Sequence, residues 1–455
     1  MPNIIIKNEY GEDELYEGVN TVRFLNEKGS VVSYKYDDGE VYSRAQQKMY
    51  RVRFRDYDGF VLKEIYVDSG DAVRYPEVAP SREGYTFVGW TWSEEDLSVV
   101  TSHMDVHALY SYEAASTTMT FVRDNSSSST INIYMYSEGA NVFEFDWGDG
   151  STSTSTRTSA GRFSVSHTYA TDLFGTIVVT VTRTSGTAEY TFGYNSISAT
   201  SFQGNSCFGT SNVAWGRRYL KHVKFASDIS VIGGHSFTGC YALQGVDLPP
   251  SVVSIARNGF YSCESLQYVM ISPNLQRIDQ YCFYDCNSLT TIALPSTLTV
   301  LGAYSFYNCR SLDSLTIPDS VNDLGSRLCH QAYGLKTIRL PQQITTLPEY
   351  VLYHCFSLRE VTIPAGVTSI EQYALTNLTN AIIRVPSSVL SISNYSLNSS
   401  GSSQVYMEAS EPPTITSNTF STGSSNVVTI HVPAHALDAY RSQWSTVAEY
   451  IVGDL

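Results

Sequence analysis

Hydrophobic side chains recur along the second half of the chain at a fixed step of 23 residues. One leucine marks each step, an aliphatic residue follows three positions later, and a second apolar residue follows two positions after that. The leucines are Leu220, Leu243, Leu266, Leu289, Leu312, Leu335 and Leu358. The alternation predicts a short strand in each copy, which the following proline ends because proline cannot donate to a sheet ladder.

The remainder of each copy adds one more apolar position and then, in most copies, a phenylalanine and a cysteine. This order predicts a strand, a turn, a second extended piece and a short helical turn. A single copy cannot bury its own apolar side chains, so the copies must stack into a solenoid with a parallel sheet along one face. The cysteines on the repeat are predicted to be buried thiols: Cys240, Cys263, Cys286, Cys309 and Cys355.

The repeat pattern LxxIxIPxxVxxIxxxAFxxCxS resembles the BspA-type leucine-rich repeat over about residues 217–400. The copy at Asn380–Leu397 is one residue out of phase, and the tail resembles the closing segment of such proteins. We expect Ala434–Trp444 to form a short capping helix.

Two further resemblances lie upstream. FEFDWGDG at Phe143–Gly150, followed by SHTYA and GTIVVTVT, resembles a PKD-type β-sandwich over about residues 117–186. Tyr50–Tyr112, with GYTFVGW at Gly84–Trp90, resembles the Listeria/Bacteroides repeat, a small β-grasp module.

These patterns predict a mainly β, multidomain chain. We expect an acidic N-terminal hairpin and anchoring segment over 1–48, a β-grasp module over 49–115 and a PKD-like sandwich over 116–190. The leucine-rich-repeat solenoid is expected over 191–404 and a C-terminal cap over 405–455. The hairpin should turn at Glu27–Gly29, and the opening residues weakly resemble phage virion proteins.

The formal charge of −15 argues against a nucleic-acid partner, because phosphate contacts need clustered Lys and Arg. The N-terminus carries no pattern of a signal peptide, and no run is long and apolar enough to predict membrane insertion. We therefore expect that the chain does not bind nucleic acid and does not insert into a membrane.

No paired carboxylates, triad or metal-ligand spacing stands out, so we predict that the chain is not an enzyme and uses no cofactor. Asp146 and Asp149 flank a tight turn and are weak candidates for a Ca²⁺ site. The favoured interpretation is that Asp149 caps this turn through the backbone.

Two faces of the solenoid are candidates for ligand binding. Tyrosines recur in two columns three residues apart, at 281, 304, 350 and 373 and at 261, 284, 307 and 353. Packing of copy against copy is the favoured explanation, and a binding stripe is the alternative. The candidate residues are Tyr261, Tyr284, Tyr307, Tyr281 and Tyr304 on this face, and Tyr268, Met270, Lys336, Arg339 and Arg359 on the sheet face.

An elongated array of modules without an active site predicts a non-catalytic binding or adhesion protein. The leading hypothesis is a phage virion structural protein that reaches the outside by lysis. Its N-terminal region would bind other virion proteins and its repeats would bind a host-surface glycan or protein. Virion attachment usually goes with symmetry, which would make the chain a homo-oligomer. The alternatives are a bacterial cell-surface adhesin of the BspA type and a binding module of a polysaccharide-degrading enzyme.

Overall fold

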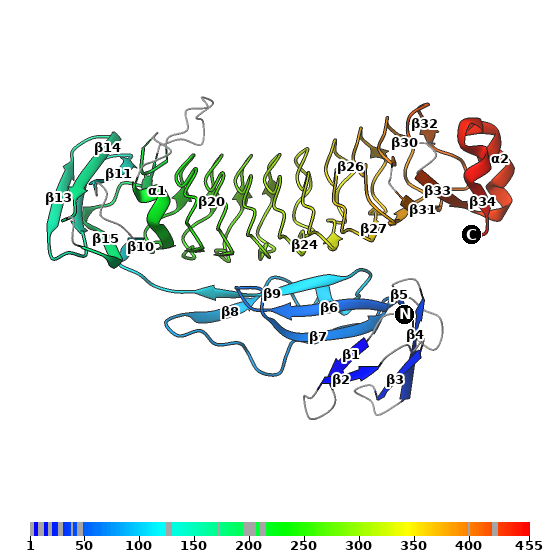
Figure 1. The fold of residues 1–455 in the computed structure, drawn as a ribbon, viewed down its shortest axis with the longest axis horizontal. Coiled ribbons are helices and arrows are strands. Elements are labelled where there is room, and N and C mark those ends of the chain that lie inside the picture. The colour runs from blue at the N-terminus through cyan, green and yellow to red at the C-terminus, as the bar shows by residue number, and fades with distance from the viewer. Residues whose placement is uncertain are drawn as a thin grey trace.

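The computed structural model describes residues 49–123, 130–170, 173–193, 206–209, 215–398, 401–420 and 426–455, together with the backbone of five strands nearer the N-terminus. These strands are β1 (Ile4–Lys7), β2 (Asp13–Tyr16), β3 (Thr21–Leu25), β4 (Val31–Asp37) and β5 (Glu40–Tyr42). β3 and β4 pair antiparallel, as the predicted hairpin requires. The predicted turn of this hairpin at Glu27–Gly29 lies outside the described residues. The described part of the chain is mainly β, and the predicted fold class is confirmed (Figure 1).

Residues 49–112 form a compact unit, here called the docked module. Its sheet has the strand order β7-β6-β9-β8, with β6 and β9 parallel and the other pairs antiparallel. Valine and phenylalanine alternate with arginine along β6, so one face of the sheet packs on a core around Val52 and Phe54 while the other face carries charge. The elements are β6 (Met49–Arg55), β7 (Val61–Asp68), β8 (Thr86–Trp90), η1 (Asp96–Ser98) and β9 (Met104–Ser111).

Residues 116–193 form a β-sandwich. One sheet contains β10, β12, β13 and β15, and the other has the order β14-β11-β16. Inward-facing aromatic residues of both sheets share one core around the fully buried Trp147. The strands are β10 (Ser116–Arg123), β11 (Thr130–Ser137), β12 (Asn141–Asp146), β13 (Thr152–Arg157), β14 (Gly161–Thr168), β15 (Gly175–Gly186) and β16 (Tyr190–Phe192).

The solenoid begins after α1 (Trp215–Tyr219) and stacks its copies in parallel at the predicted step. Val223, Val246 and Val269 are direct partners in three successive strands. The sheet-face strands are β17 (Leu220–Lys224), β19 (Gly245–Asp247), β21 (Tyr268–Met270), β24 (Ser314–Thr316), β25 (Thr337–Arg339), β27 (Glu360–Thr362), β29 (Ile382–Val385), β31 (Gly401–Met407), β33 (Asn426–Val432) and β34 (Ile451–Gly453). The second strands are β18 (Val231–Ile232), β20 (Ser254–Ile255), β22 (Arg277–Ile278), β23 (Val300–Leu301), β26 (Thr346–Leu347), β28 (Ser369–Ile370), β30 (Ser391–Ile392) and β32 (Thr414–Ile415).

The sandwich is continuous with the solenoid. β10 pairs antiparallel with β17, which joins them in one sheet of order β13-β12-β15-β10-β17-β19-β21. A single apolar cluster runs from Met119 in the sandwich to Trp444 near the C-terminus. The sandwich therefore closes the N-terminal end of the stack, where the first strand would otherwise be an open edge.

The C-terminal end is closed by η2 (Ala434–Ala436), α2 (Leu437–Gln443) and η3 (Ser445–Tyr450). Tyr440 and Trp444 are buried there and donate to the carbonyls of Ala409 and Pro413. The pairing of Glu360 with Ile382 shows the predicted shift of one residue. All eight cysteines are buried free thiols, which confirms the prediction for those on the repeat. No described helix combines the length and the apolar character needed to span a membrane.

Candidate interaction surfaces

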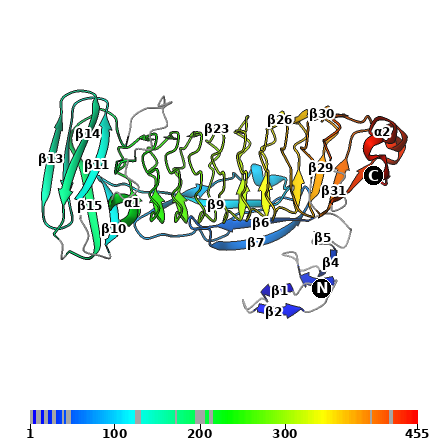
Figure 2. The same ribbon diagram turned by 45° about the horizontal axis from the view of Figure 1, so that its top comes forward.

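The docked module lies along the sheet face of the solenoid (Figures 1 and 2). Its contacts run from Lys224, whose ammonium lies 4.3 Å from the ring centroid of Tyr85, to Arg339, whose guanidinium lies 4.1 Å from the ring centroid of Trp92. The loop before β7 approaches the solenoid at Gly59. A Cβ on this residue, whose φ is +91°, would lie 2.7 Å from Cγ2 of Thr291.

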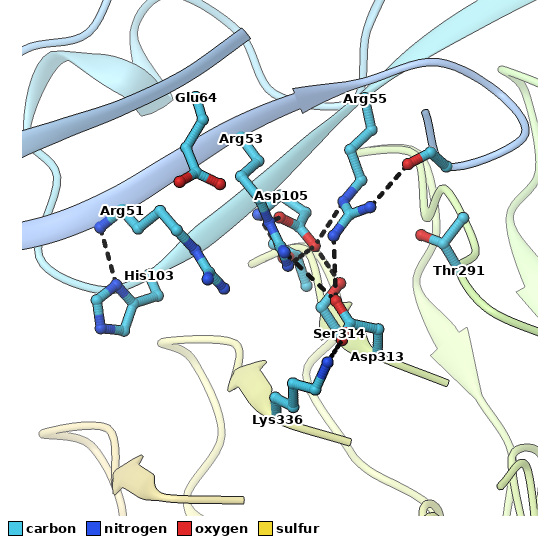
Figure 3. A network of polar contacts seen from close by, with 12 residues as sticks. Arg51, Arg53, Arg55, Glu64, His103, Asp105, Thr291, Asp313, Ser314 and Lys336 are labelled. Atoms are coloured by element: carbon cyan, nitrogen blue, oxygen red, sulfur yellow. Dashed lines mark hydrogen bonds and ion pairs between the residues drawn. The ribbon is translucent and has the colours of Figure 1, made fainter. Parts of the chain in front are cut away.

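A cluster of charged residues joins the module to the middle of the solenoid (Figure 3). Arg53 donates from Nε and Nη2 to the two carboxylate oxygens of Asp105 at 2.6 and 2.9 Å. Nη1 of Arg53 and Nη2 of Arg55 reach Oδ2 of Asp313 at 3.3 and 3.2 Å. Ser314 donates to Asp105, and Lys336 Nζ lies 2.7 Å from Oδ1 of Asp313. Two buried cations are thus shared between a carboxylate of the module and one of the solenoid.

Burial and charge within the cluster shift the pKa values of its carboxylates and of the neighbouring His107. Burial alone would raise the pKa of Asp105 and Asp313, but hydrogen bonds and nearby cations outweigh it and lower both values. His107, buried beside the cluster, has its pKa lowered to about 4 by desolvation. Its Nε2 lies 3.3 Å from the hydroxyl of Thr291. The carboxylates are therefore charged and the imidazole neutral at pH 7.

A second charged contact lies nearer the sandwich. Asp247 of β19 is fully buried, and its Oδ2 accepts from the Tyr85 hydroxyl at 2.6 Å and lies 3.4 Å from Nη2 of Arg82. The Arg82 guanidinium sits between the rings of Tyr57 and Tyr85, 3.9 and 3.7 Å from their centroids. His222 Nε2 lies 3.1 Å from the same carboxylate. Burial favours the neutral acid, but the bonds from His222, Arg82 and Tyr85 lower the pKa of Asp247.

The predicted sheet-face residues fall at or beside this interface. Met270 is buried among module residues, and Tyr268 packs edge-on against Tyr57 with ring centroids 5.5 Å apart. Arg339 is buried and forms two bonds to Asp319. The Lys336 side chain stays exposed apart from its pair with Asp313. Arg359 lies beyond these contacts and donates to two carbonyls, of Phe356 and Thr379.

The predicted tyrosine columns form a continuous strip along another face. Rings of neighbouring turns stack almost parallel, with centroids 4.7 Å apart for Tyr261 and Tyr284, 4.4 Å for Tyr284 and Tyr307, and 4.5 Å for Tyr281 and Tyr304. We call this the tyrosine strip, which contains Tyr261, Tyr281, Tyr284, Tyr304, Tyr307, Arg327, His330, Tyr350, Tyr353, Tyr373 and Tyr395.

One turn replaces both tyrosines without interrupting the strip. The Arg327 guanidinium lies 5.4 Å from the ring of Tyr304 and 4.3 Å from that of Tyr350. His330 lies 4.7 Å from both Tyr307 and Tyr353. The ring faces thus contact other members of the strip, which is the packing role favoured above. All members are half-buried. The side chains of Tyr281 and Tyr304, and those of Tyr284 and Tyr307, also hydrogen-bond to each other.

The backbone beneath the strip is unusual. Tyr281, Tyr304, Tyr350, Tyr373 and Tyr395 all have φ between +55° and +60°, the left-handed region. The amide of Tyr281 donates to Ala303 of the next turn, and the same bond recurs at Tyr304 and Tyr350. The neighbouring left-handed column instead carries small or polar residues: Ser262, Asp285, Asn308, Gln331, His354 and Asn377. A left-handed non-glycine residue costs about 1–3 kcal/mol, so tyrosine is an expensive choice at these positions.

The weak Ca²⁺ candidates are hydrogen-bonded within their turn. Asp146 accepts from the amide of Gly148, and Asp149 accepts from the amide and hydroxyl of Ser151. The other Asp149 oxygen lies 2.7 Å from Nε2 of His167, whose ring stacks on Trp147. These bonds give Asp149 the capping role that the sequence favours, and no cluster of potential metal ligands occurs in the described ranges.

Sequence patterns did not indicate that the module would cover the sheet face. The available signal was the alternation of Arg51, Arg53 and Arg55 on one face of a predicted strand, of which Arg53 and Arg55 reach Asp313 on the solenoid. Predicting that contact requires knowing how the chain folds back between them.

Comparisons with known proteins bear on the repeats. The BspA-type leucine-rich repeat region matches at residues 210–335 and 325–443, just over half of the chain. No curated protein matches. The PKD and β-grasp resemblances lie outside the matched region and stay predictions.

Several solved structures are similar over part of the chain. A leucine-rich repeat protein from T. pallidum is 29% identical, covering 33% of this chain and 78% of that one, with a TM-score of 0.31. One from Bacteroides ovatus is 18% identical, covering 48% and 67%, with a TM-score of 0.40. The pneumococcal vaccine antigen PcpA is 14% identical, covering 53% and 81%, with a TM-score of 0.30. On the family match and the 23-residue solenoid, this chain belongs to the BspA-type leucine-rich repeat family.

Proposed function

We propose that this chain is a non-catalytic adhesion protein of the BspA type that binds a partner on a cell surface through its tyrosine strip. The observation that carries the proposal is the division of the solenoid's faces. The docked module occupies the sheet face from Lys224 to Arg339, whereas the tyrosine strip runs half-buried along successive turns outside these contacts.

The chemistry of the strip favours a hydroxylated ligand such as a surface glycan. Tyrosine hydroxyls both donate and accept hydrogen bonds. Charge enters the strip at Arg327, which pairs with Glu349 at 3.6 Å, and beside it at Arg257, 5.1 Å from the ring centroid of Tyr281. The cost of left-handed tyrosines supports a role beyond turn formation, because asparagine or glycine would satisfy the same backbone at lower cost.

Binding of the labelled chain to bacterial and host cells, and to glycan and protein arrays, tests this proposal. The decisive variant changes Tyr284, Tyr304 and Tyr307 to Phe, which removes three hydroxyls and keeps the stacked rings. We expect binding to fall at least about tenfold, because each hydroxyl contributes a hydrogen bond worth about 1 kcal/mol. Tyr136→Phe, on a half-buried residue of the sandwich, is the matched control. Unchanged binding by the triple variant would refute the strip as the site, and selective binding to protein probes would replace the glycan.

The cell-surface adhesin and the virion protein differ in where this binding protein is displayed. Membership of the BspA-type family supports the bacterial surface. The virion hypothesis rests on the first 48 residues, whose side chains lie outside the described part, and it stays a prediction. Neighbouring genes for capsid or tail proteins would favour the virion.

A further inference from the structure

Strand β13 forms an outer edge of the long sheet. It pairs with β12 from Asn141↔Arg157 to Asp146↔Thr152 without a shift in register, and within the described ranges β12 is its one neighbour. In Figures 1 and 2 it lies at the end of the molecule opposite to the C-terminal cap. Its backbone groups on the outer side therefore point away from the rest of the described structure.

Over residues 152–156 this edge lacks the usual protection against pairing, and the one charge on the strand is Arg157 at its end. Exposed edge strands are normally blocked by charges, proline, a bulge or a covering segment. Residues 152–156 read TSTST, with no charge and no proline, and their register with β12 is regular. Thr152, Thr154 and Thr156 are exposed, and Ser153 and Ser155 between them are half-buried.

The same five residues are self-complementary. Residues directly opposite each other in an antiparallel pair lie on one face of the sheet, so a two-fold axis between identical strands must pass beside a single residue. With Thr154 at the axis, Thr152 lies opposite Thr156 of the second copy and Ser153 lies opposite its Ser155. Every pair joins identical residue types without like charges, and cross-strand Thr–Thr pairs are favourable.

We propose that β13 is a homodimer interface at which a second copy of this chain adds its own β13 in antiparallel orientation. The long sheet then continues across the two-fold axis from one solenoid to the other. The two C-terminal caps lie at opposite ends of the dimer, and both tyrosine strips remain outside the contact. We name a second copy of this chain as the partner because the residues of β13 are complementary to those of an identical strand.

Site-directed cross-linking tests the contact and its register. Thr154→Cys places a thiol beside its own copy, at the Cα separation that a disulfide spans. Thr152→Cys is the matched control: both positions are exposed on one strand, but position 152 and its copy would be four residues apart in register, roughly 13 Å. All eight native thiols are buried, so the introduced cysteine is the reactive one. We expect a covalent dimer from Thr154→Cys under mild oxidation and none from Thr152→Cys. Equal cross-linking of both variants, or of neither, would overturn the proposal.

Sedimentation equilibrium gives a second test that needs no new cysteine. The unmodified chain should form dimers, and Thr154→Lys should raise the dimer dissociation constant by about tenfold, because two like charges then face each other at the axis. Thr176→Lys adds the same charge at an exposed position of the interior strand β15 and should leave the constant unchanged. A monomer at all soluble concentrations, or equal effects of the two lysines, would refute the interface.

Discussion

Replacing Asp313 by Ala should weaken the attachment of the docked module without unfolding it. Asp313 belongs to the solenoid, so the change leaves the pair of Arg53 and Asp105 inside the module intact. It removes the contacts of 3.3 and 3.2 Å by which Arg53 and Arg55 reach across the interface. The side chains of both arginines are 9% exposed and that of Asp313 is 26% exposed.

The magnitude follows from these contacts. A hydrogen bond to a charged group contributes about 1.5–3 kcal/mol, and the long distances and partial exposure of Asp313 place both bonds at the low end. Together they contribute about 3 kcal/mol, which corresponds to roughly a hundredfold change in a dissociation constant. Lys336 also loses its partner, but its side chain is 68% exposed and remains hydrated.

The assay needs the module to be separable. A protease site placed at residues 113–115, where Glu113 and Ala115 are exposed, allows the connection to be cut in the folded protein. The unmodified module should stay bound after cleavage, and its dissociation constant can be measured by fluorescence anisotropy. Asp279→Ala is the control, because Asp279 pairs with the exposed Arg277 on the same solenoid away from the module. If Asp313→Ala binds as tightly as the control, the charged cluster does not hold the module.

Three further outcomes are expected. The pKa of His107 is lowered from 6.5 to about 4 in the folded protein, so between these pH values the unfolded chain binds a proton there that the folded chain does not. The free energy of unfolding should therefore fall by about 3 kcal/mol as pH drops from 6.5 to 4. Denaturant titrations of His107→Asn should show a smaller dependence of stability on pH. Gly59→Ala should cost about 1–3 kcal/mol of docking free energy through its φ of +91° and its clash with Thr291. Adding Thr291→Ala should restore only part of that loss in the cleaved-module assay, and full restoration would argue against backbone strain. Burial raises the pKa of the repeat thiols Cys240, Cys263, Cys286, Cys309 and Cys355, so a thiol reagent should modify them only after denaturation; rapid reaction in native buffer would contradict the buried core.

The spacing of the repeat was enough to predict which side chains stack on each other along the solenoid. A step of 23 residues fixes which side chain lies above which, so stacked rungs such as Val223, Val246 and Val269 follow from spacing alone. The same arithmetic placed Tyr284 beside Tyr307. The left-handed backbone beneath the tyrosines was not predictable, because tyrosine rarely adopts it and the cost is met by contacts between turns.

The contacts of the docked module do not follow from the repeat. Arg53 and Asp313 are separated by 260 positions, and no periodicity connects them. Their contact depends on the direction in which the chain leaves β9 and on the pairing of β10 with β17, which are long-range features. Both faces of the solenoid were therefore candidates in the sequence, whereas Met270 and Arg339 are buried in the structure.

The lengthwise position of the module also has a mechanical consequence. In a repeat protein each rung normally touches only the rungs above and below, so rungs can peel away one at a time from an end. The module contacts positions from Lys224 to Arg339, and its anchors at Asp247 and Asp313 lie on different turns. Pulling on this part of the solenoid must therefore break several module contacts at the same time, so its turns resist unfolding together. The C-terminal turns beyond Arg359 have no such contact with the module's described anchors, and under tension they should yield first.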